Sequence, residues 1–135
     1  MNWQTIMINK DLTKNEVKRI LSTIFSVDTQ KIEIYKNYEL VADKNESILI
    51  FCVSSIAQTD YFLRLEIYID ESININDDFK LIKEFCKLAN CNILFDDGTN
   101  NPYTWLLVHS SGETENISID IDSYDNAEEY DLKTS

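Results

Sequence analysis

The stretch YFLRLEIYID, residues 61–70, constrains the fold more than any other part of the sequence. Its apolar side chains recur at every second position, which is the period of a β-strand with one buried face. The chain therefore has to build a sheet that is covered on at least one side. The predicted buried face carries Tyr61, Leu63, Leu65, Ile67 and Ile69, and the opposite face carries Arg64, Glu66, Tyr68 and Asp70. Because this opposite face is polar, it faces either water or a partner.

An amphipathic helix is predicted over residues 13–25. Its apolar residues recur at intervals of three and four, so they form one stripe along the helix. Thr13 and Glu16 have the spacing of a capping box, which marks the start of a helix. The stripe consists of Val17, Ile20, Leu21, Ile24 and Phe25.

A second helix is predicted over residues 77–89, with Asn76 as its N-cap. Asp77 and Asp78 fall in its first turn and Lys83 and Lys87 toward its end, so each charge matches the sign of the helix dipole. Its apolar stripe consists of Phe79, Ile82, Phe85, Cys86 and Ala89.

Further strands are predicted from short apolar runs that are bounded by turn formers. The resulting order is α-β-β-β-α-β-β-β, and short turns between strands favour antiparallel pairing. The predicted fold class is α+β, a largely antiparallel β-sheet with two helices packed on it. The strand at 47–54 is apolar on both faces, so we expect it at the centre of the sheet. The other predicted strands cover residues 31–36, 92–96, 103–110 and 115–122.

The length of 135 residues is that of one domain, so we expect a single domain over 1–135 with a polar acidic tail from about residue 123. No stretch approaches the roughly 20 apolar residues of a membrane span, and no apolar run of signal-peptide length follows Met1. Cys52, Cys86 and Cys91 lack the spacing of a zinc site and are expected as reduced core thiols. These features predict a cytoplasmic protein.

Acidic residues outnumber basic residues by 24 to 12, for a net charge of −12. Residues 1–87 hold 14 acidic and 11 basic residues, whereas residues 88–135 hold 10 acidic residues and one basic residue, for a net charge of −9. Nucleic acids and anionic membranes need Lys and Arg on their protein partners, so neither is expected as a ligand. A protein with a basic surface is the natural complement. The alternative is an acidic surface that only keeps the protein in solution.

The predicted partner-binding residues lie in two segments. The first is the acidic stretch 117–131, in which alternation turns the isoleucines inward and displays the carboxylates. The second is the turn at 96–105, which is either a rigid connection or a presentation of aromatic anchors. The predicted residues are Asp120, Asp122, Tyr124, Asp125, Glu128, Glu129, Tyr130 and Asp131 in the first segment, and Asp96, Asp97, Tyr103 and Trp105 in the second.

No motif predicts catalysis, a metal or a cofactor. The stretch DIDSYD, residues 120–125, spaces carboxylates two apart but lacks the Gly and the Glu of an EF-hand loop. His109 has no predicted nucleophile and third group, so we interpret it as a structural or surface histidine. With only two glycines the chain cannot supply a phosphate-binding loop. We therefore expect a protein that is not an enzyme.

One resemblance covers about a quarter of the chain. The stretch LANCNILFDDGTNNPYTWLLVHSSGETENISIDID, residues 88–122, precedes an acidic tail in a chain rich in Asn, Ile and Lys. In this the chain resembles the small acidic immunity proteins of bacterial polymorphic-toxin and contact-dependent growth inhibition systems. The resemblance implies a protein that binds and neutralises a cognate toxin domain. It includes no diagnostic motif, so no functional residue is transferred.

Two alternatives stay open. The predicted order of elements also looks like that of the acidic chaperones of type III secretion effectors, which work as homodimers. Those chaperones usually close with a helix, whereas this chain is predicted to close with a strand and a polar tail. The other alternative is an acidic mimic of nucleic acid. Whether the protein is a monomer or a homodimer stays open, and a nuclease-type toxin with a basic surface is the expected partner.

Overall fold

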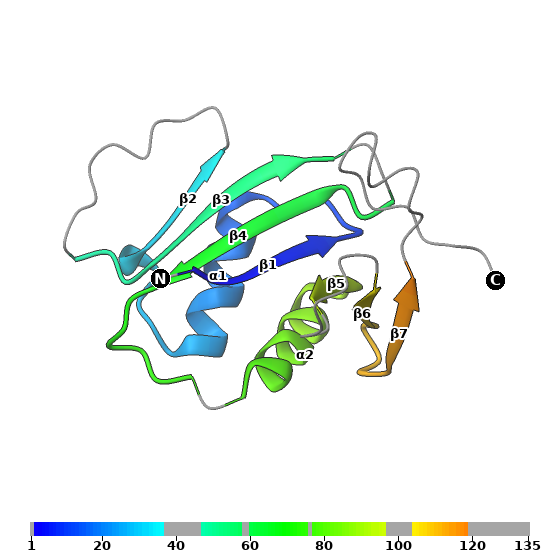
Figure 1. The fold of residues 1–135 in the computed structure, drawn as a ribbon. Helices are drawn as coiled ribbons and strands as arrows, with labels where there is room; N and C mark the ends of the chain where they lie inside the picture. Colours follow the sequence, from blue (N-terminus) through cyan, green and yellow to red (C-terminus); the bar gives the residue numbers. More distant parts are fainter. Residues whose placement is uncertain (1, 37–46, 58–59, 76, 97–103, 119–135) are drawn as a thin grey trace.

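The computed structural model describes residues 2–36, 47–57, 60–75, 77–96 and 104–118. Within these residues the chain forms seven strands, two α-helices and one short 3-10 helix (Figure 1). In chain order they are β1 (Asn2–Ile8), α1 (Lys14–Phe25), η1 (Thr29–Lys31), β2 (Ile32–Lys36), β3 (Ile50–Ile56), β4 (Leu63–Ile69), α2 (Asp78–Ala89), β5 (Ile93–Asp96), β6 (Thr104–Val108) and β7 (Thr114–Ser118).

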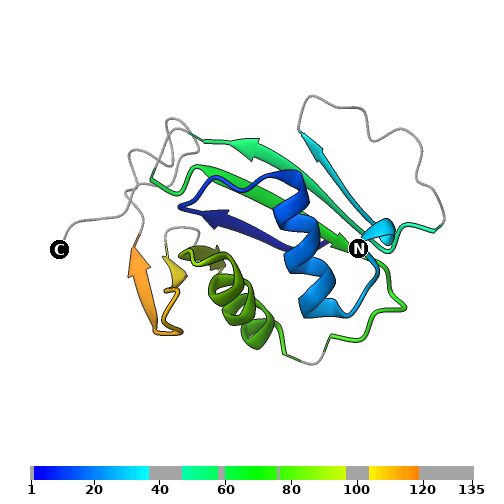
Figure 2. The same ribbon diagram turned by 180° about the vertical axis from the view of Figure 1, so that it is seen from behind.

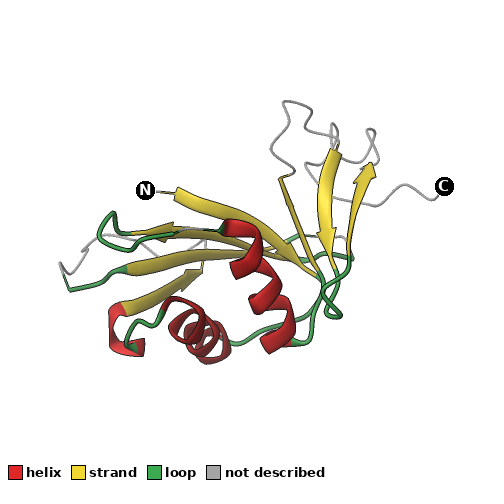
Figure 3. Ribbon diagram, turned by 90° about the horizontal axis from the view of Figure 1, so that it is seen from below, coloured by secondary structure: helices red, strands yellow, loops and turns green. Residues whose placement is uncertain are grey.

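The seven described strands form one sheet in the order β2-β3-β4-β1-β5-β6-β7. Neighbouring strands are antiparallel except β2 and β3, which are parallel. Both helices pack on the same face of the sheet and contact each other (Figure 2). Seen from below, β5, β6 and β7 turn away from the plane of the other four strands (Figure 3). The predicted α+β fold, with two helices on a largely antiparallel sheet, is confirmed.

The central strand β1 was not predicted from the sequence. It lies between β4 and β5, and its residues Ile6, Met7 and Ile8 are fully buried. Ile6 and Ile8 belong to the core under the helices, whereas Met7 belongs to a smaller cluster on the other face. A strand that is covered on both faces shows no alternation, so the period-two pattern does not reveal it. The observed order is β-α-β-β-β-α-β-β-β.

The position of β3 also differs from the prediction. β3 begins at Ile50 and lies next to the edge strand β2, so it is not the centre of the sheet. Its residues Ile50 and Cys52 are fully buried, but Phe51 and Val53 on the other face are only partly buried. The apolar character of both faces therefore has a different cause: one face joins the core, and the other displays an aromatic side chain.

Strand β4 confirms the alternation that the sequence predicts. Leu63, Leu65, Ile67 and Ile69 are buried in the main core, together with residues of both helices. Tyr61 is also buried, but it precedes β4 and packs in the smaller cluster on the opposite face. The smaller cluster consists of Met7, Tyr61, Leu94 and Leu107, with Ala57, Trp105 and Ile117 packed against it.

Helix α1 begins with the predicted capping box. The backbone N–H of Glu16 donates to Thr13 Oγ1 at 3.1 Å, and the backbone N–H of Thr13 donates to Glu16 Oε1 at 3.1 Å. These hydrogen bonds lower the pKa of Glu16 below its ordinary value of 4.5, because they favour the carboxylate. The buried residues Val17, Ile20 and Leu21 of the predicted stripe face the core.

Replacement of Thr13 by Ala is expected to destabilise the protein by about 1 kcal/mol, because the helix loses its capping oxygen. Because the pKa of Glu16 is lowered in the folded state, its charged carboxylate stabilises the fold above pH 4.5. This stabilisation is lost as the pH falls through the pKa of the folded state. Urea denaturation at neutral pH measures the loss. Asn15→Ala, an exposed change in the same turn, serves as the control. Equal stability of the two variants would contradict the role of the cap.

Helix α2 is capped one residue later than predicted. Asp77 is the N-cap, and its carboxylate accepts a hydrogen bond from the backbone N–H of Lys80 at 3.1 Å. Asp78 in the first turn and Lys87 in the last turn confirm the predicted match to the helix dipole. Trp3 Nε1 donates to Asp78 Oδ1 at 2.8 Å, which joins the start of α2 to the central strand β1.

Candidate functional site

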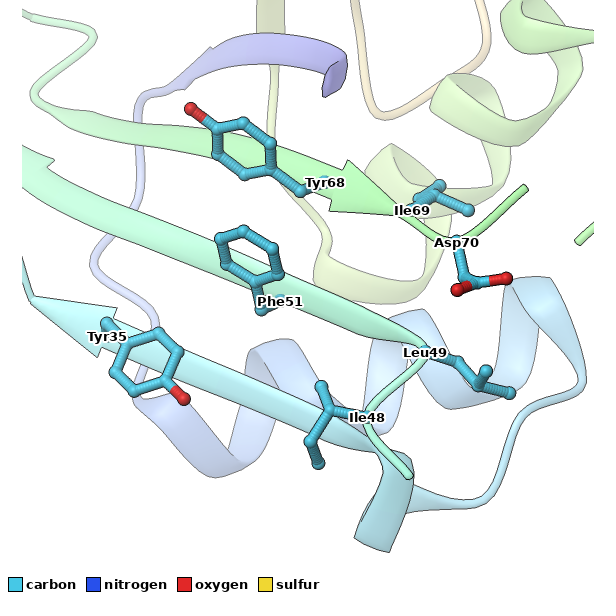
Figure 4. Close-up of a pocket in the computed structure, with 7 residues that line it drawn as sticks. All are labelled: Tyr35, Ile48, Leu49, Phe51, Tyr68, Ile69 and Asp70. Carbon is cyan, nitrogen blue, oxygen red and sulfur yellow. The ribbon is translucent and has the colours of Figure 1, made fainter. Parts of the chain in front are cut away.

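An aromatic stripe crosses the helix-free face of β2, β3 and β4. Tyr35, Phe51 and Tyr68 each come from a different strand, and all three are partly exposed (Figure 4). Phe51 lies directly opposite Tyr68 in the register, and their rings stack with centroids 4.6 Å apart at 5°. The ring of Tyr35 meets Phe51 edge-on, with centroids 6.3 Å apart at 71°. We refer to these three residues as the aromatic stripe.

The stripe follows from alternation on three adjacent strands. In β2 the side chains of Ile32 and Ile34 enter the core, so Tyr35 takes the opposite face. In β4 the same alternation places Tyr68 beside Glu66 and Arg64 on the predicted polar face. Because no described helix packs on this face, three aromatic rings that could have filled a core instead meet the surface.

Two charged groups lie at the β4 end of the stripe. The hydroxyl of Tyr68 donates to Glu66 Oε2 at 3.0 Å, and Arg64 Nη2 lies 3.5 Å from Glu66 Oε1. The hydrogen bond to Glu66 raises the pKa of Tyr68 above 10.0, because ionisation would place two negative charges side by side. The ring of Tyr68 is thus fixed by stacking on one side and by a hydrogen bond at its tip.

Replacement of Glu66 by Gln is expected to lower the pKa of Tyr68 toward 10.0, because the amide carries no charge. A raised pKa means that the stability from this contact is complete below pH 10.0 and is lost as the pH rises through the folded-state pKa. NMR titration of ring-labelled tyrosine measures the shift. Glu71→Gln removes an exposed charge that does not contact Tyr68 and should leave its pKa unchanged. A pKa that stays raised in Glu66→Gln would disprove the assignment.

A small hollow lies beside the stripe, where β4 runs into the following turn. It has a volume of about 110 Å³ and is lined by Tyr35, Ile48, Leu49, Phe51, Tyr68, Ile69 and Asp70 (Figure 4). Asp70 is exposed, and its Oδ1 accepts a hydrogen bond from the backbone N–H of Ser72 at 2.9 Å. Hydrogen bonds from Ser72 lower the pKa of Asp70 below 3.8, so its carboxylate is charged at neutral pH.

Two of the residues predicted at the partner surface fall in the described part of the chain. Asp96 in β5 pairs with Trp105 in β6, so the structure brings these two positions together. Trp105 is partly buried against the smaller cluster. The segment considered for calcium, residues 120–125, lies outside the described residues. So do the other ten predicted partner-binding residues, Asp97, Tyr103, Asp120, Asp122, Tyr124, Asp125, Glu128, Glu129, Tyr130 and Asp131.

The histidine and the three cysteines of the chain all lie within the described residues. His109 Nε2 lies 2.7 Å from Glu115 Oε1, and both side chains are partly exposed at the β6–β7 turn. Cys52, Cys86 and Cys91 are free and buried, as predicted. Burial raises the pKa of the Cys52 thiol, which disfavours the reactive thiolate. The described residues contain no group of three or more metal-ligating side chains.

The aromatic stripe was missed in the sequence because its members come from three separate strands. Alternation placed Tyr68 on an open face, but the apolar run 47–54 hid the outward direction of Phe51. Tyr35 stands at the end of a short strand whose partner was unknown. The signal that could have revealed the stripe is the presence of one aromatic residue at the polar-face position of each strand.

Comparisons with protein-family models, with curated proteins and with solved structures found no match for this chain. None of the helices in the described residues is long and apolar enough to cross a membrane.

Proposed function

We propose that this chain is a non-enzymatic immunity protein, which binds and neutralises a cognate toxin domain in the bacterial cytoplasm. The observation that carries the proposal is the aromatic stripe on an open sheet face. Tyrosine is enriched among the residues that dominate protein interfaces, and Phe is enriched in interface cores. Rings that are fixed before binding lose little side-chain freedom when the partner arrives, which favours tight association.

The charge of the chain supports a basic partner. The net charge of −12 steers a positively charged protein toward this one and repels nucleic acid. A nuclease-type toxin has Lys and Arg in its phosphate-binding cleft, so it is the proposed class of target. The aromatic stripe then supplies the anchors, and the acidic last third of the chain supplies the long-range attraction.

Co-expression with the product of the neighbouring open reading frame tests the proposal. The neighbour is expected to be toxic alone and to be bound and neutralised by this protein. A neighbour that is neither toxic nor bound would disprove the proposal. A homodimer by light scattering, with an effector segment bound at high salt as well as at low salt, would instead favour a secretion chaperone, because apolar burial is not screened.

Variants of the aromatic stripe locate the interface once the partner is known. Tyr68→Ala is expected to weaken binding by about 2 kcal/mol or more, as for a central aromatic anchor. Thr23→Ala, an exposed change on α1 on the other side of the sheet, is the control. Wild-type affinity of Tyr68→Ala would place the interface elsewhere.

Neutralisation of the acidic stretch tests the role of charge separately. The change replaces each acid by its amide and should slow association, with an effect that shrinks as salt rises. Folding should be nearly unchanged, since exposed substitutions usually alter stability by less than about 0.5 kcal/mol. An unchanged association rate would reduce the stretch to a solubilising role. The neutralised residues are Asp120, Asp122, Asp125, Glu128, Glu129 and Asp131.

A further inference from the structure

We propose that the hollow beside the aromatic stripe binds a single Lys or Arg side chain of the protein partner. This inference rests on the proposed function and identifies one specific contact within it. Four features carry the argument: the size of the hollow, its apolar walls, its aromatic surfaces and the carboxylate of Asp70 at its rim (Figure 4).

The size of the hollow selects a side chain. Pockets for cofactors and drug-sized ligands measure about 300–1,000 Å³. The volume of about 110 Å³ is too small for such a ligand but accommodates one extended side chain. A nucleotide or a folded peptide segment therefore does not fit inside it.

The walls of the hollow suit the methylene stem of Lys or Arg. Ile48 and Leu49 are partly buried and line the hollow with apolar atoms. Long cationic side chains bury their stems along such surfaces while the charged head reaches a polar group. Tyr35, Phe51 and Tyr68 also line the hollow, so aromatic rings border the space that the cation would enter. The negative face of an aromatic ring attracts a cation that approaches within about 6 Å.

The charged group at the rim has the sign that a cation requires. The carboxylate of Asp70 is exposed and is oriented by hydrogen bonds from the backbone and the side chain of Ser72, whereas a carboxylate accepts roughly four. The exposed Glu71 follows it in the chain. Arg64, further along the same face, is paired with Glu66. The cationic residue Lys31 is close in the fold, since its backbone carbonyl accepts a hydrogen bond from the N–H of Leu49. Lys31 is not one of the residues that line the hollow.

A short peptide tests the hollow without knowledge of the partner. The probe is acetyl-Gly-Arg-Gly-amide, and the control is the same peptide with citrulline, which has nearly the same shape and no charge. Titration into isotopically labelled wild-type protein at low salt should shift the backbone NMR signals of Phe51, Tyr68 and Asp70 in a saturable way. The citrulline peptide should bind more weakly at these positions. Equal responses to the two peptides, or no saturable shift at these residues, would overturn the inference.

Two matched variants separate the hollow from the general acidity of the protein. Asp70→Asn keeps an oxygen for the Ser72 hydrogen bond, and it should lower the affinity for the arginine peptide about two- to fivefold. Asp60→Asn makes the same chemical change at an exposed position outside the hollow and should leave affinity unchanged. Thermal unfolding confirms that both variants are folded. Equal weakening by both variants would attribute binding to net charge alone and overturn the inference.

The outcomes for the hollow and for the proposed function are distinguishable. If the hollow binds the arginine peptide and no toxin is bound by the protein, the proposed function fails while the cation site stands. If a toxin is neutralised and the peptide does not bind, the proposed function stands and the cation site fails.

Discussion

Deletion of residues 2–8 is expected to leave a chain without a cooperative unfolding transition. These residues form β1, which pairs with β4 on one side and with β5 on the other. Its loss exposes the backbone edges of both neighbours and removes Ile6, Met7 and Ile8 from the core. Truncation of one buried aliphatic side chain to Ala lowers the free energy of unfolding by about 2–5 kcal/mol. A whole domain has a net stability of about 5–15 kcal/mol. The deletion therefore removes about as much stability as a domain possesses.

Point variants in β1 provide graded controls for the deletion. Ile6 lies opposite Leu65 in β4 and Phe95 in β5, so Ile6→Ala should cost about 2–5 kcal/mol. Thr5 is partly exposed, and Thr5→Ala should cost less than about 1 kcal/mol. Urea denaturation followed by circular dichroism measures all three proteins. A deletion variant with the cooperativity of wild type would show that β1 is not part of the sheet.

Replacement of Phe85 by Ala is expected to lower the free energy of unfolding by about 3–5 kcal/mol. Phe85 is 1% exposed and lies in α2, where it packs in the main core between the helices and the sheet. Truncation removes the ring from its apolar surroundings and leaves a cavity that the helix can fill only in part. The midpoint of urea denaturation should fall while the slope of the transition stays unchanged, which identifies a change in stability alone.

The control for Phe85 is a position on the outer side of the same helix. Lys80 is exposed, and Lys80→Ala keeps the backbone N–H that donates a hydrogen bond to the cap residue Asp77. This variant should differ from wild type by no more than about 0.5 kcal/mol. A similar loss in the two variants would contradict the role of core packing, because Ala is the best helix former and neither change lowers helix propensity.

Local signals predicted most of the secondary structure because they act over short distances along the chain. The capping box of Thr13 and Glu16 defines the start of α1 by hydrogen bonds within a single turn. The alternation in β4 reports that one face is buried, whatever covers it. The one-residue difference in the cap of α2 arose because Asn76 and Asp77 are both favourable N-cap residues.

The candidate site depended on strand pairing, which local signals do not encode. Phe51 and Tyr68 stack because their strands are neighbours in a specific register, and they are separated along the chain by the whole β3–β4 connection. The parallel pairing of β2 with β3 brings Tyr35 to the same face. Three residues that look unrelated in the sequence thus become one surface.

The sequence by itself determined the α+β class, the two helices, the alternation of β4 and the acidic charge of the chain. Each of these depends on the type and spacing of nearby residues, or on composition. Only the tertiary structure decided that β1 is central, that β3 lies beside the edge and that an aromatic stripe remains on the surface. The physical reason is that burial on a second face, and contact across strands, depend on which distant segments pair.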